Sequence, residues 1–323
     1  MSRVMKYHPN GSVLFVSSSI EEGLLFLCNP LCLGILRSCL TVALCLYPVE
    51  LCHFIVQPTH IHMIFVVKNP EDVPRFLRFF KCETAHMFNR LLGRKKRTVW
   101  CEGYDSPIVL TPLRALVAIA YLYANPAKDN LTESIDEYEG FSSWGMFSAN
   151  SYLEVHKRIR RTQCKYLPKW KQNPKGYQEE ADRILSETDD TYTITLNPNA
   201  WLDAFGIKEK AEQERWNARI IQRIRALEER AKRVREQKGH RAIGADRLRR
   251  ASFDLSYRPH RSGKRMWCLS EKRSIRQEHI AFFKELMYAA REVARRWILG
   301  DFSVPYPPGL HAPCMPRLAN VMP

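Results

Sequence analysis

Residues 49–67 read VELCHFIVQPTHIHMIFVV, and this stretch decides the fold class. Two runs rich in β-branched and aromatic residues, 49–57 and 60–67, flank the dipeptide Pro58–Thr59. Two such runs joined by a two-residue turn predict a pair of adjacent antiparallel strands. We therefore expect a mostly antiparallel sheet in this part of the chain.

The segments on either side of this pair supply further strands and the helices that would pack on them. The sequence predicts strands over 11–17 and within 98–110, where Gly103 and Asp105–Pro107 mark a turn, and helices over 31–46, 71–93 and 111–125. The last helix begins with Thr111 as N-cap and Pro112 as first residue, and Pro126 is expected to end it. This order predicts an α+β fold, an antiparallel sheet with packed helices.

The apolar stretch 23–48 raises the question of a membrane span. Asn29–Pro30 interrupts it early and Arg37 lies in its middle. The uninterrupted pieces are about a dozen residues long, whereas a spanning helix needs roughly 20. The first residues also lack the layout of a signal peptide. We expect a buried helix, no membrane partner and a cytoplasmic protein.

Charge is distributed unevenly over the 323 residues, whose net charge is +16. Residues 1–149 contain 14 Lys and Arg and 13 Asp and Glu, whereas residues 150–323 contain 36 and 21. This asymmetry predicts two regions, a domain over 1–150 and a basic, mainly helical region over 151–323. Such an excess of positive charge favours a polyanionic partner, nucleic acid before membrane.

The basic region is predicted to be helical with one strand. We expect helices over 176–187, 207–238 and 271–299, a strand over 191–196 and a Pro-rich tail over 303–323. The apolar stripe of the 207–238 helix comprises Trp216, Ile220, Ile224, Leu227, Ala231 and Val234. Its other faces carry Arg215, Arg219 and Arg223, and an earlier basic loop holds Arg94, Lys95, Lys96 and Arg97. These side chains are candidates for neutralising DNA phosphates.

Ten cysteines do not form the spacing of a structural metal site. There is no CxxC pair, and the CxxxC pair Cys28 and Cys32 has no partner pair at zinc-site spacing. We expect reduced, mostly buried thiols.

His60 and His62 are the first candidates for chemistry. On a strand both imidazoles project from one face, about 7 Å apart at the backbone, so that both can reach one divalent ion. Taken alone, the pattern equally describes two histidines on a half-exposed strand.

Tyr121 and Asn125 are the second candidates. They lie four residues apart on one predicted helix and therefore share a face. A tyrosine hydroxyl can act as a nucleophile, and an amide oxygen can complete a metal site. The alternative is a core tyrosine followed by a helix-ending asparagine. Tyr123 lies two residues from Tyr121, on a different face of the predicted helix.

Four segments, in order, carry a family resemblance: HIHMIF at 60–65, AHMFNRLLGRKKRTVWCEGYDSPIVL at 85–110, AYLYANPAK at 120–128 and DEYEGFSSW at 136–144. Together they resemble the HUH single-tyrosine transposases, in the subgroup associated with repetitive extragenic palindromes. The likeness spans residues 10–150. The family's usual Pro-Asn-His is replaced here by Pro58-Thr59-His60.

The resemblance implies a ferredoxin-like sheet and a site for DNA strand transfer. His60, His62 and Asn125 would hold Mg²⁺ or Mn²⁺, and Tyr121 would attack a phosphate of single-stranded or hairpin DNA. The product would be a 5′-phosphotyrosine and a free 3′-hydroxyl. A monomer or homodimer associated with the nucleoid is the expected form.

Two other functions compete with this one. A non-catalytic DNA-binding protein could use the same scaffold and the same basic surface. A nucleotide hydrolase of the histidine-triad kind would need a third alternating histidine, but Ile64 occupies that position.

Overall fold

A five-stranded sheet forms the centre of the molecule. The computed structural model describes residues 6–20, 30–95, 97–151, 153–168, 172–187, 190–249 and 266–313. The strands are β1 (Val13–Ser19), β2 (Glu50–Val56), β3 (His60–Val66), β4 (Ile108–Val109) and β7 (Cys268–Leu269), in the order β2-β3-β1-β4-β7. Only the β4–β7 pair is parallel. The predicted strand pair around Pro58–Thr59 is therefore confirmed.

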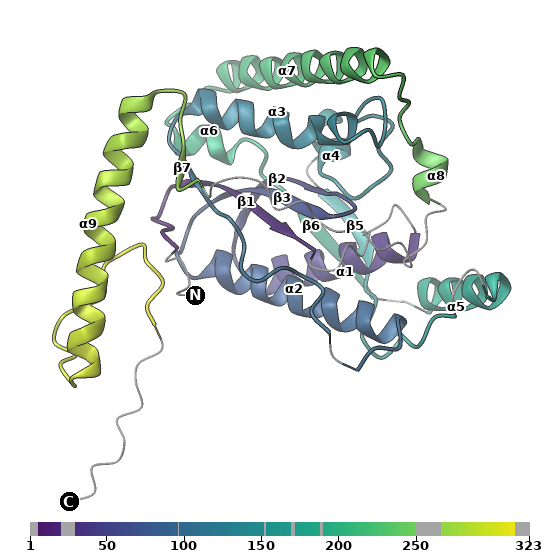
Figure 1. The fold of residues 1–323 in the computed structure, drawn as a ribbon, viewed down its shortest axis with the longest axis horizontal. Helices are drawn as coiled ribbons and strands as arrows, with labels where there is room; N and C mark the ends of the chain where they lie inside the picture. Colours follow the sequence, from purple (N-terminus) through teal and green to yellow (C-terminus); the bar gives the residue numbers. More distant parts are fainter. Residues whose placement is uncertain are drawn as a thin grey trace, which may run out of the picture.

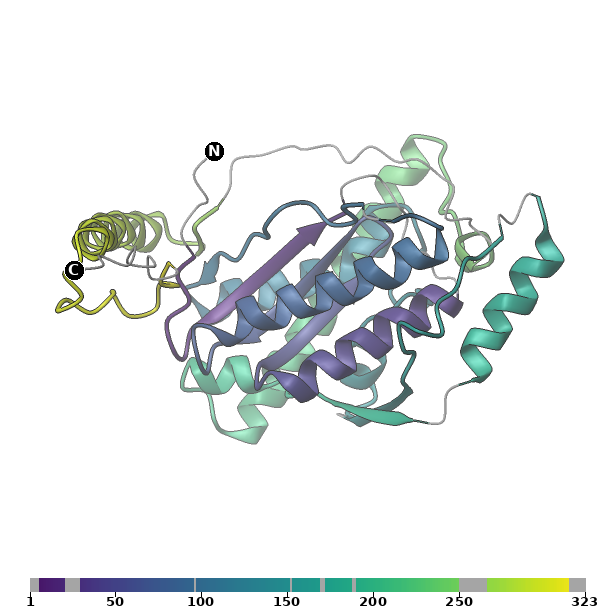
Figure 2. The same cartoon turned by 90° about the horizontal axis from the view of Figure 1, so that it is seen from below.

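Two helices cover one face of this sheet. They are α1 (Pro30–Leu46) and α2 (Asp72–Leu91), which lie side by side across the strands (Figure 2). The chain order β1-α1-β2-β3-α2-β4 with β1 and β3 at the centre is the ferredoxin-like arrangement, so the predicted α+β fold is confirmed. Among the described residues, no helix has both the length and the apolar character needed to cross a membrane.

The strands direct alternate side chains to two different cores. Val16, Met63 and Phe65 pack in the cluster that contains α1 and α2. Val13, Ile55 and Ile64 pack in a second cluster with helix α3 (Pro112–Lys128), which covers the opposite face (Figure 1). Because side chains alternate along a strand, successive residues point into different cores.

Helix α3 begins as predicted but ends later. The Thr111 hydroxyl accepts a hydrogen bond from the Arg114 N–H at 3.3 Å, and Pro112 is the first helical residue. The helix continues through Pro126 to Lys128, so the predicted end was wrong. A proline this close to the end of a helix removes a single backbone donor, and the carbonyls of Asn125 and Pro126 accept from Asp129 and Leu131 at 2.8 Å each.

The segment 98–110 contains less strand than predicted. Only β4 forms there, whereas the earlier part meets β1 through the single bridges Ile20–Trp100 and Ser17–Asp105. Gly103 turns the chain between these bridges with a φ of +73°.

The remaining elements surround this core. They are α4 (Trp144–Ser148), β5 (Leu153–Lys157), α5 (Pro174–Ser186), β6 (Thr191–Thr195), α6 (Ala200–Ala204), α7 (Lys210–Gln237), α8 (Ala245–Arg249) and α9 (Arg273–Ile298). The three predicted helices and the strand of the basic region are confirmed as α5, α7, α9 and β6. The antiparallel pair β5–β6 packs against α1. Of the predicted tail, 303–313 forms no helix or strand, and 314–323 lie outside the described residues.

Helix α7 packs on the outer side of α3 (Figure 1). Ile220 and Ile224 are buried as predicted, but Val234 is 43% exposed and Arg235 is buried instead. The Arg235 guanidinium donates to the Ala127 carbonyl at 2.9 Å and pairs with Glu133, so it joins α7 to the end of α3. Since β7 also enters the main sheet, the basic region contacts the first 150 residues, and the boundary near residue 150 stays a prediction.

Arg235→Ala should lower the free energy of unfolding by about 3 kcal/mol, because it removes the buried guanidinium that donates to the Ala127 carbonyl and pairs with Glu133. Urea unfolding measures this. The control is Arg233→Ala. The exposed Arg233 side chain pairs with Glu229, so its loss should lower the free energy of unfolding by less than about 1 kcal/mol. Equal effects of the two substitutions would contradict the anchoring role.

His53 predicts acid sensitivity of the fold. Its Nε2 faces the Pro198 carbonyl at 3.1 Å and therefore donates, so Nδ1 accepts from the Tyr123 hydroxyl at 2.9 Å. Burial lowers the pKa of His53 to about 3. Below its unfolded pKa of about 6.5, only the unfolded chain takes up this proton, so stability should fall with pH by about 1.4 kcal/mol per unit.

Urea unfolding at pH 7.5 and 5.5 tests this expectation. His53→Gln should flatten the pH dependence, whereas the same substitution at the exposed His240 should not. An unchanged slope in the His53 variant would contradict it.

The eight described cysteines are all free thiols. Five are buried, as expected, but Cys45 and Cys82 are exposed and Cys101 is partly exposed. Cys28 and Cys314 lie outside the described residues.

Candidate functional site

The two histidines open β3 on the face that α3 covers. His62 pairs with Ser17 of β1 and Ile55 of β2, so its side chain is on the face of Ile55. The rings of His60 and His62 lie 4.7 Å apart between centroids, at 77° to each other. The strand alternation thus brings both imidazoles together, as the sequence predicts.

Thr59 orients the first imidazole. Its hydroxyl lies 3.0 Å from Nδ1 of His60. When Nδ1 donates to this hydroxyl, Nε2 keeps a free lone pair, which is the form that binds a metal. Thr59 therefore has a specific contact to the first histidine of the candidate site.

His62 is enclosed by aromatic rings. It is 7% exposed, stacks on the Phe15 ring at 5.1 Å, and meets the Tyr121 ring edge-on at 6.0 Å. Neither Nδ1 nor Nε2 has a hydrogen-bond partner among the described residues. Burying such nitrogens costs about 1–3 kcal/mol each, so this arrangement calls for a partner that completes it.

Two amides at the same end of the sheet share this property. Asn125, one turn after Tyr121 on α3, is buried and its Nδ2 has no partner in the described part of the chain. Gln57 follows β2, and neither its Oε1 nor its Nε2 is paired there. Because an amide group carries an oxygen beside its nitrogen, either side chain can present an oxygen to a ligand.

Gln57 is not among the residues that the sequence predicts for this site. It lies two residues after Ile55 and its backbone N–H donates to the His60 carbonyl at 2.8 Å. The period-2 pattern from Ile55 is the signal that places it on the histidine face.

Tyr121 lies at the mouth of this cluster. Its side chain is 39% exposed, and the Lys128 ammonium lies 3.7 Å from the ring centroid. Burial, and secondarily Asp129, raises the pKa of Tyr121, while burial lowers the pKa of Lys128. The phenol is therefore protonated at neutral pH, and removing its proton requires a neighbouring base or cation.

Tyr123 has a structural environment. It is fully buried, and its hydroxyl forms hydrogen bonds with Nδ1 of His53 at 2.9 Å and with the Ser143 hydroxyl at 2.8 Å. Burial raises its pKa far above the ordinary value. Its hydroxyl belongs to the core beneath α3.

The two histidines are held neutral. Burial lowers the pKa of both, and for His62 the neighbouring His60 and Lys128 lower it further. Neutral imidazoles carry the lone pairs that bind a divalent ion.

The side chains at this site could bind a metal ion through imidazole nitrogens and amide oxygens. In the described ranges, no three His, Cys, Asp or Glu side chains are clustered so that they could hold a metal. The candidate set is different, with two imidazoles and the amides of Asn125 and Gln57. Imidazole and carbonyl ligands are compatible with Mn²⁺ and, less typically, Mg²⁺.

The predicted basic residues form two separate groups. Arg94, Lys95 and Arg97 lie in the loop after α2, and Lys96 is outside the described residues. Arg215, Arg219 and Arg223 are exposed on α7, with the Arg219 guanidinium 4.5 Å from the centre of the Trp216 ring. Because α2 and α7 lie on opposite sides of the sheet, the structure does not bring the two groups together (Figure 1).

Comparison with known proteins adds a weak structural likeness. No family model matches the chain, and no curated protein matches it. Among solved structures, the chain is similar to one described as the structure of the REP-associated tyrosine transposase bound to a REP hairpin. The sequences are 18% identical, and the match covers 46% of this chain and 86% of that one with a TM-score of 0.40.

Proposed function

We propose that this protein cuts and rejoins single-stranded or hairpin DNA through Tyr121, with a divalent metal held by the histidine pair. One observation carries the proposal. The accessible Tyr121 meets the His62 ring edge-on, the His60 ring adjoins that of His62, and neither nitrogen of His62 has a hydrogen-bond partner among the described residues. A structural role for His62 leaves that arrangement unexplained.

His60, His62 and Asn125 would hold Mg²⁺ or Mn²⁺, with Gln57 as a further oxygen donor. The bound ion would polarise the scissile phosphate and offset its developing charge. Thr59 fixes the His60 ring, and Phe15 fixes the His62 ring from the side.

Tyr121 performs the covalent step. Its phenolic oxygen forms a bond to phosphorus while the bond from phosphorus to the 3′-oxygen breaks. The phenolic proton leaves Tyr121, and the departing oxygen takes up a proton as a 3′-hydroxyl. The 5′-phosphotyrosine retains a phosphodiester, so another 3′-hydroxyl can reverse the reaction.

Lys128 would assist the nucleophile. Its ammonium lies 3.7 Å from the centre of the Tyr121 ring, and a positive charge there would favour the phenolate over the phenol. Tyr121, both histidines and Asn125 come from one chain, so one copy carries the whole set.

A denaturing gel tests the function. Hairpin DNA from the flanks of the protein's own gene, labelled at its 3′ end, and a pool of labelled hairpins with randomised single-stranded flanks are incubated with the protein and Mn²⁺ or EDTA. We expect a metal-dependent band of protein joined to the labelled 3′ fragment. Tight, salt-sensitive binding without such a band would favour the non-catalytic DNA-binding protein.

A further inference from the structure

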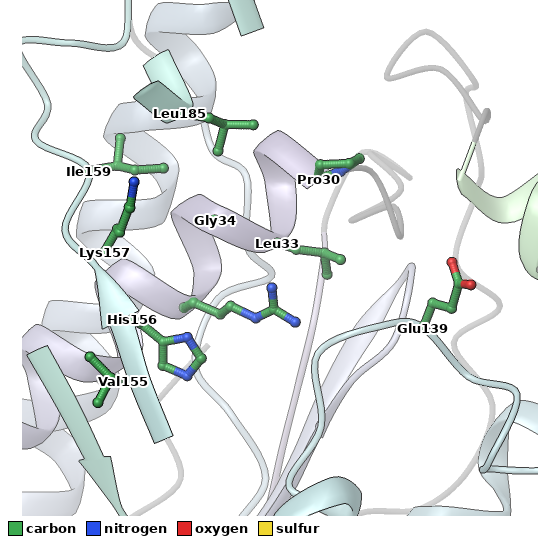
Figure 3. Close-up of a pocket in the computed structure, with 10 residues that line it drawn as sticks. Pro30, Leu33, Gly34, Glu139, Val155, His156, Lys157, Ile159 and Leu185 are labelled. Atoms are coloured by element: carbon green, nitrogen blue, oxygen red, sulfur yellow. The ribbon is translucent and has the colours of Figure 1, made fainter. Parts of the chain in front are cut away.

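A hollow of about 420 Å³ lies between α1, β5 and the loop that follows α3 (Figure 3). Its lining includes the charged side chains of Arg37, Glu139 and Lys157 and the imidazole of His156. In Figure 3, Glu139 lies across the hollow from the side formed by Val155, His156 and Ile159. The volume is within the range of small-molecule sites.

Part of the wall is apolar and closely packed. Leu33, Ile159 and Leu185 supply it, and a Cβ on Gly34 would lie 3.0 Å from the end atoms of both Ile159 and Leu185. Glycine at this position therefore lets the two side chains reach the helix. The result is a surface suited to a flat, apolar ligand face.

Two buried nitrogens lie at the hollow. His156 is about nine-tenths buried, and its Nε2 lies 3.4 Å from the Glu154 carboxylate, a contact that lowers the pKa of Glu154. Nε of Arg37 is buried and has no hydrogen-bond partner among the described residues. The Arg37 guanidinium lies 5.6 Å from the centre of the Phe141 ring.

The charges around the hollow balance. Arg37 and Lys157 line it with positive charge, while Glu139 lines it and Glu154 adjoins it with negative charge. Because the positive and negative charges offset each other, a simple inorganic anion would bind weakly here. A heterocycle that both donates and accepts hydrogen bonds, with a flat apolar face, matches the nitrogens, the carboxylate and the apolar wall together.

The hollow is connected to the histidine end of the sheet by one loop. Glu139 belongs to the segment 138–142, whose Phe141 carbonyl accepts from the Val56 N–H at 2.8 Å. The Tyr138 hydroxyl donates to the Val56 carbonyl at 2.7 Å. Val56 directly precedes Gln57, so the same loop lines the hollow and adjoins the candidate site.

We propose that the hollow binds the base of one unpaired nucleotide, with the exposed Lys157 near its phosphate. Its assignment to the strand that Tyr121 cuts rests on the proposed function. Binding of a base in the hollow does not rest on the proposed function, because it needs neither the metal nor Tyr121. The same chemistry could come from a free nucleotide, which the experiment separates from a DNA strand.

The test measures binding in EDTA by fluorescence anisotropy, so that no cleavage occurs. The probes are a labelled single-stranded 10-mer, a duplex of the same length, and the four deoxynucleoside monophosphates as competitors. The variants are His156→Phe and Arg37→Met, which keep shape and remove the nitrogens. The control is Arg160→Met, an exposed arginine paired with Asp190 and outside the lining.

We expect both variants to weaken binding of the single strand about tenfold and to leave duplex binding unchanged. The control should behave as the unmodified protein does. Unchanged affinity of both variants for the single strand would overturn the proposal. Monophosphates that bind through His156 without displacing the strand would assign the hollow to a free nucleotide instead.

A crosslinking measurement on the unmodified protein keeps the test independent of variant folding. A single strand carrying 5-iododeoxyuridine should crosslink to peptides containing 30–37 or 153–159. Crosslinks confined to other segments would overturn the proposal. Crosslinks at these peptides without covalent capture by Tyr121 would support the base site and refute strand cleavage.

Discussion

Tyr121→Phe is expected to abolish covalent capture of DNA, by about three orders of magnitude or more, while binding of the same DNA is retained. The substitution removes only the phenolic oxygen. The ring contacts to Phe15, His62 and Lys128 remain, so the surroundings keep their packing. The denaturing gel measures capture, and anisotropy in EDTA measures binding.

The matched control is Tyr123→Phe, two residues further along α3. It should capture DNA, but it loses hydrogen bonds to His53 and Ser143 and should be less stable by about 1 kcal/mol. Persistent capture by the Tyr121→Phe protein would place the nucleophile elsewhere. Loss of capture in both variants at equal stability would contradict the assignment of Tyr123 to the core.

His62→Leu is expected to weaken Mn²⁺ binding at least about 100-fold and to leave the protein as stable or more stable by about 1 kcal/mol. The replaced ring is buried and its two nitrogens have no partners in the described part of the chain. Leucine has no polar side-chain atoms, so the free-energy cost of burying these nitrogens disappears. The variant would lose metal binding and gain stability. Calorimetric titration and urea unfolding in EDTA measure the two effects.

His53→Leu is the control on the neighbouring strand. His53 pairs in register with Ile64, on the same sheet face, but both of its ring nitrogens are hydrogen-bonded. Its replacement should destabilise the fold by about 1–3 kcal/mol and spare Mn²⁺ binding. If His62→Leu instead destabilises the protein as His53→Leu does and spares Mn²⁺ binding, His62 is structural.

Long periodic segments were predictable because their pattern is local. The strand pair at 49–67 and the helices α1, α2, α5, α7 and α9 appear where the hydrophobic period predicts them. A period of two or of 3.6 reports which face of one element is buried, whatever packs against it.

Short elements and special side chains were not predictable in this way. β7 has two residues and exists through pairing with β4, a strand distant in the chain. Arg235 is buried only because the end of α3 supplies a carbonyl and Glu133. Such elements take their stability from neighbours that the local pattern does not reveal.

The sequence by itself determined that His60 and His62 share a strand face and that Tyr121 and Asn125 share a helix face, because backbone repeats set both spacings. Only the tertiary structure decided that these two faces meet. Burial of apolar residues from β1, β2 and β3 against α3 brings the Tyr121 ring to 6.0 Å from His62. The same packing encloses the His62 nitrogens and the Gln57 amide without hydrogen-bond partners among the described residues.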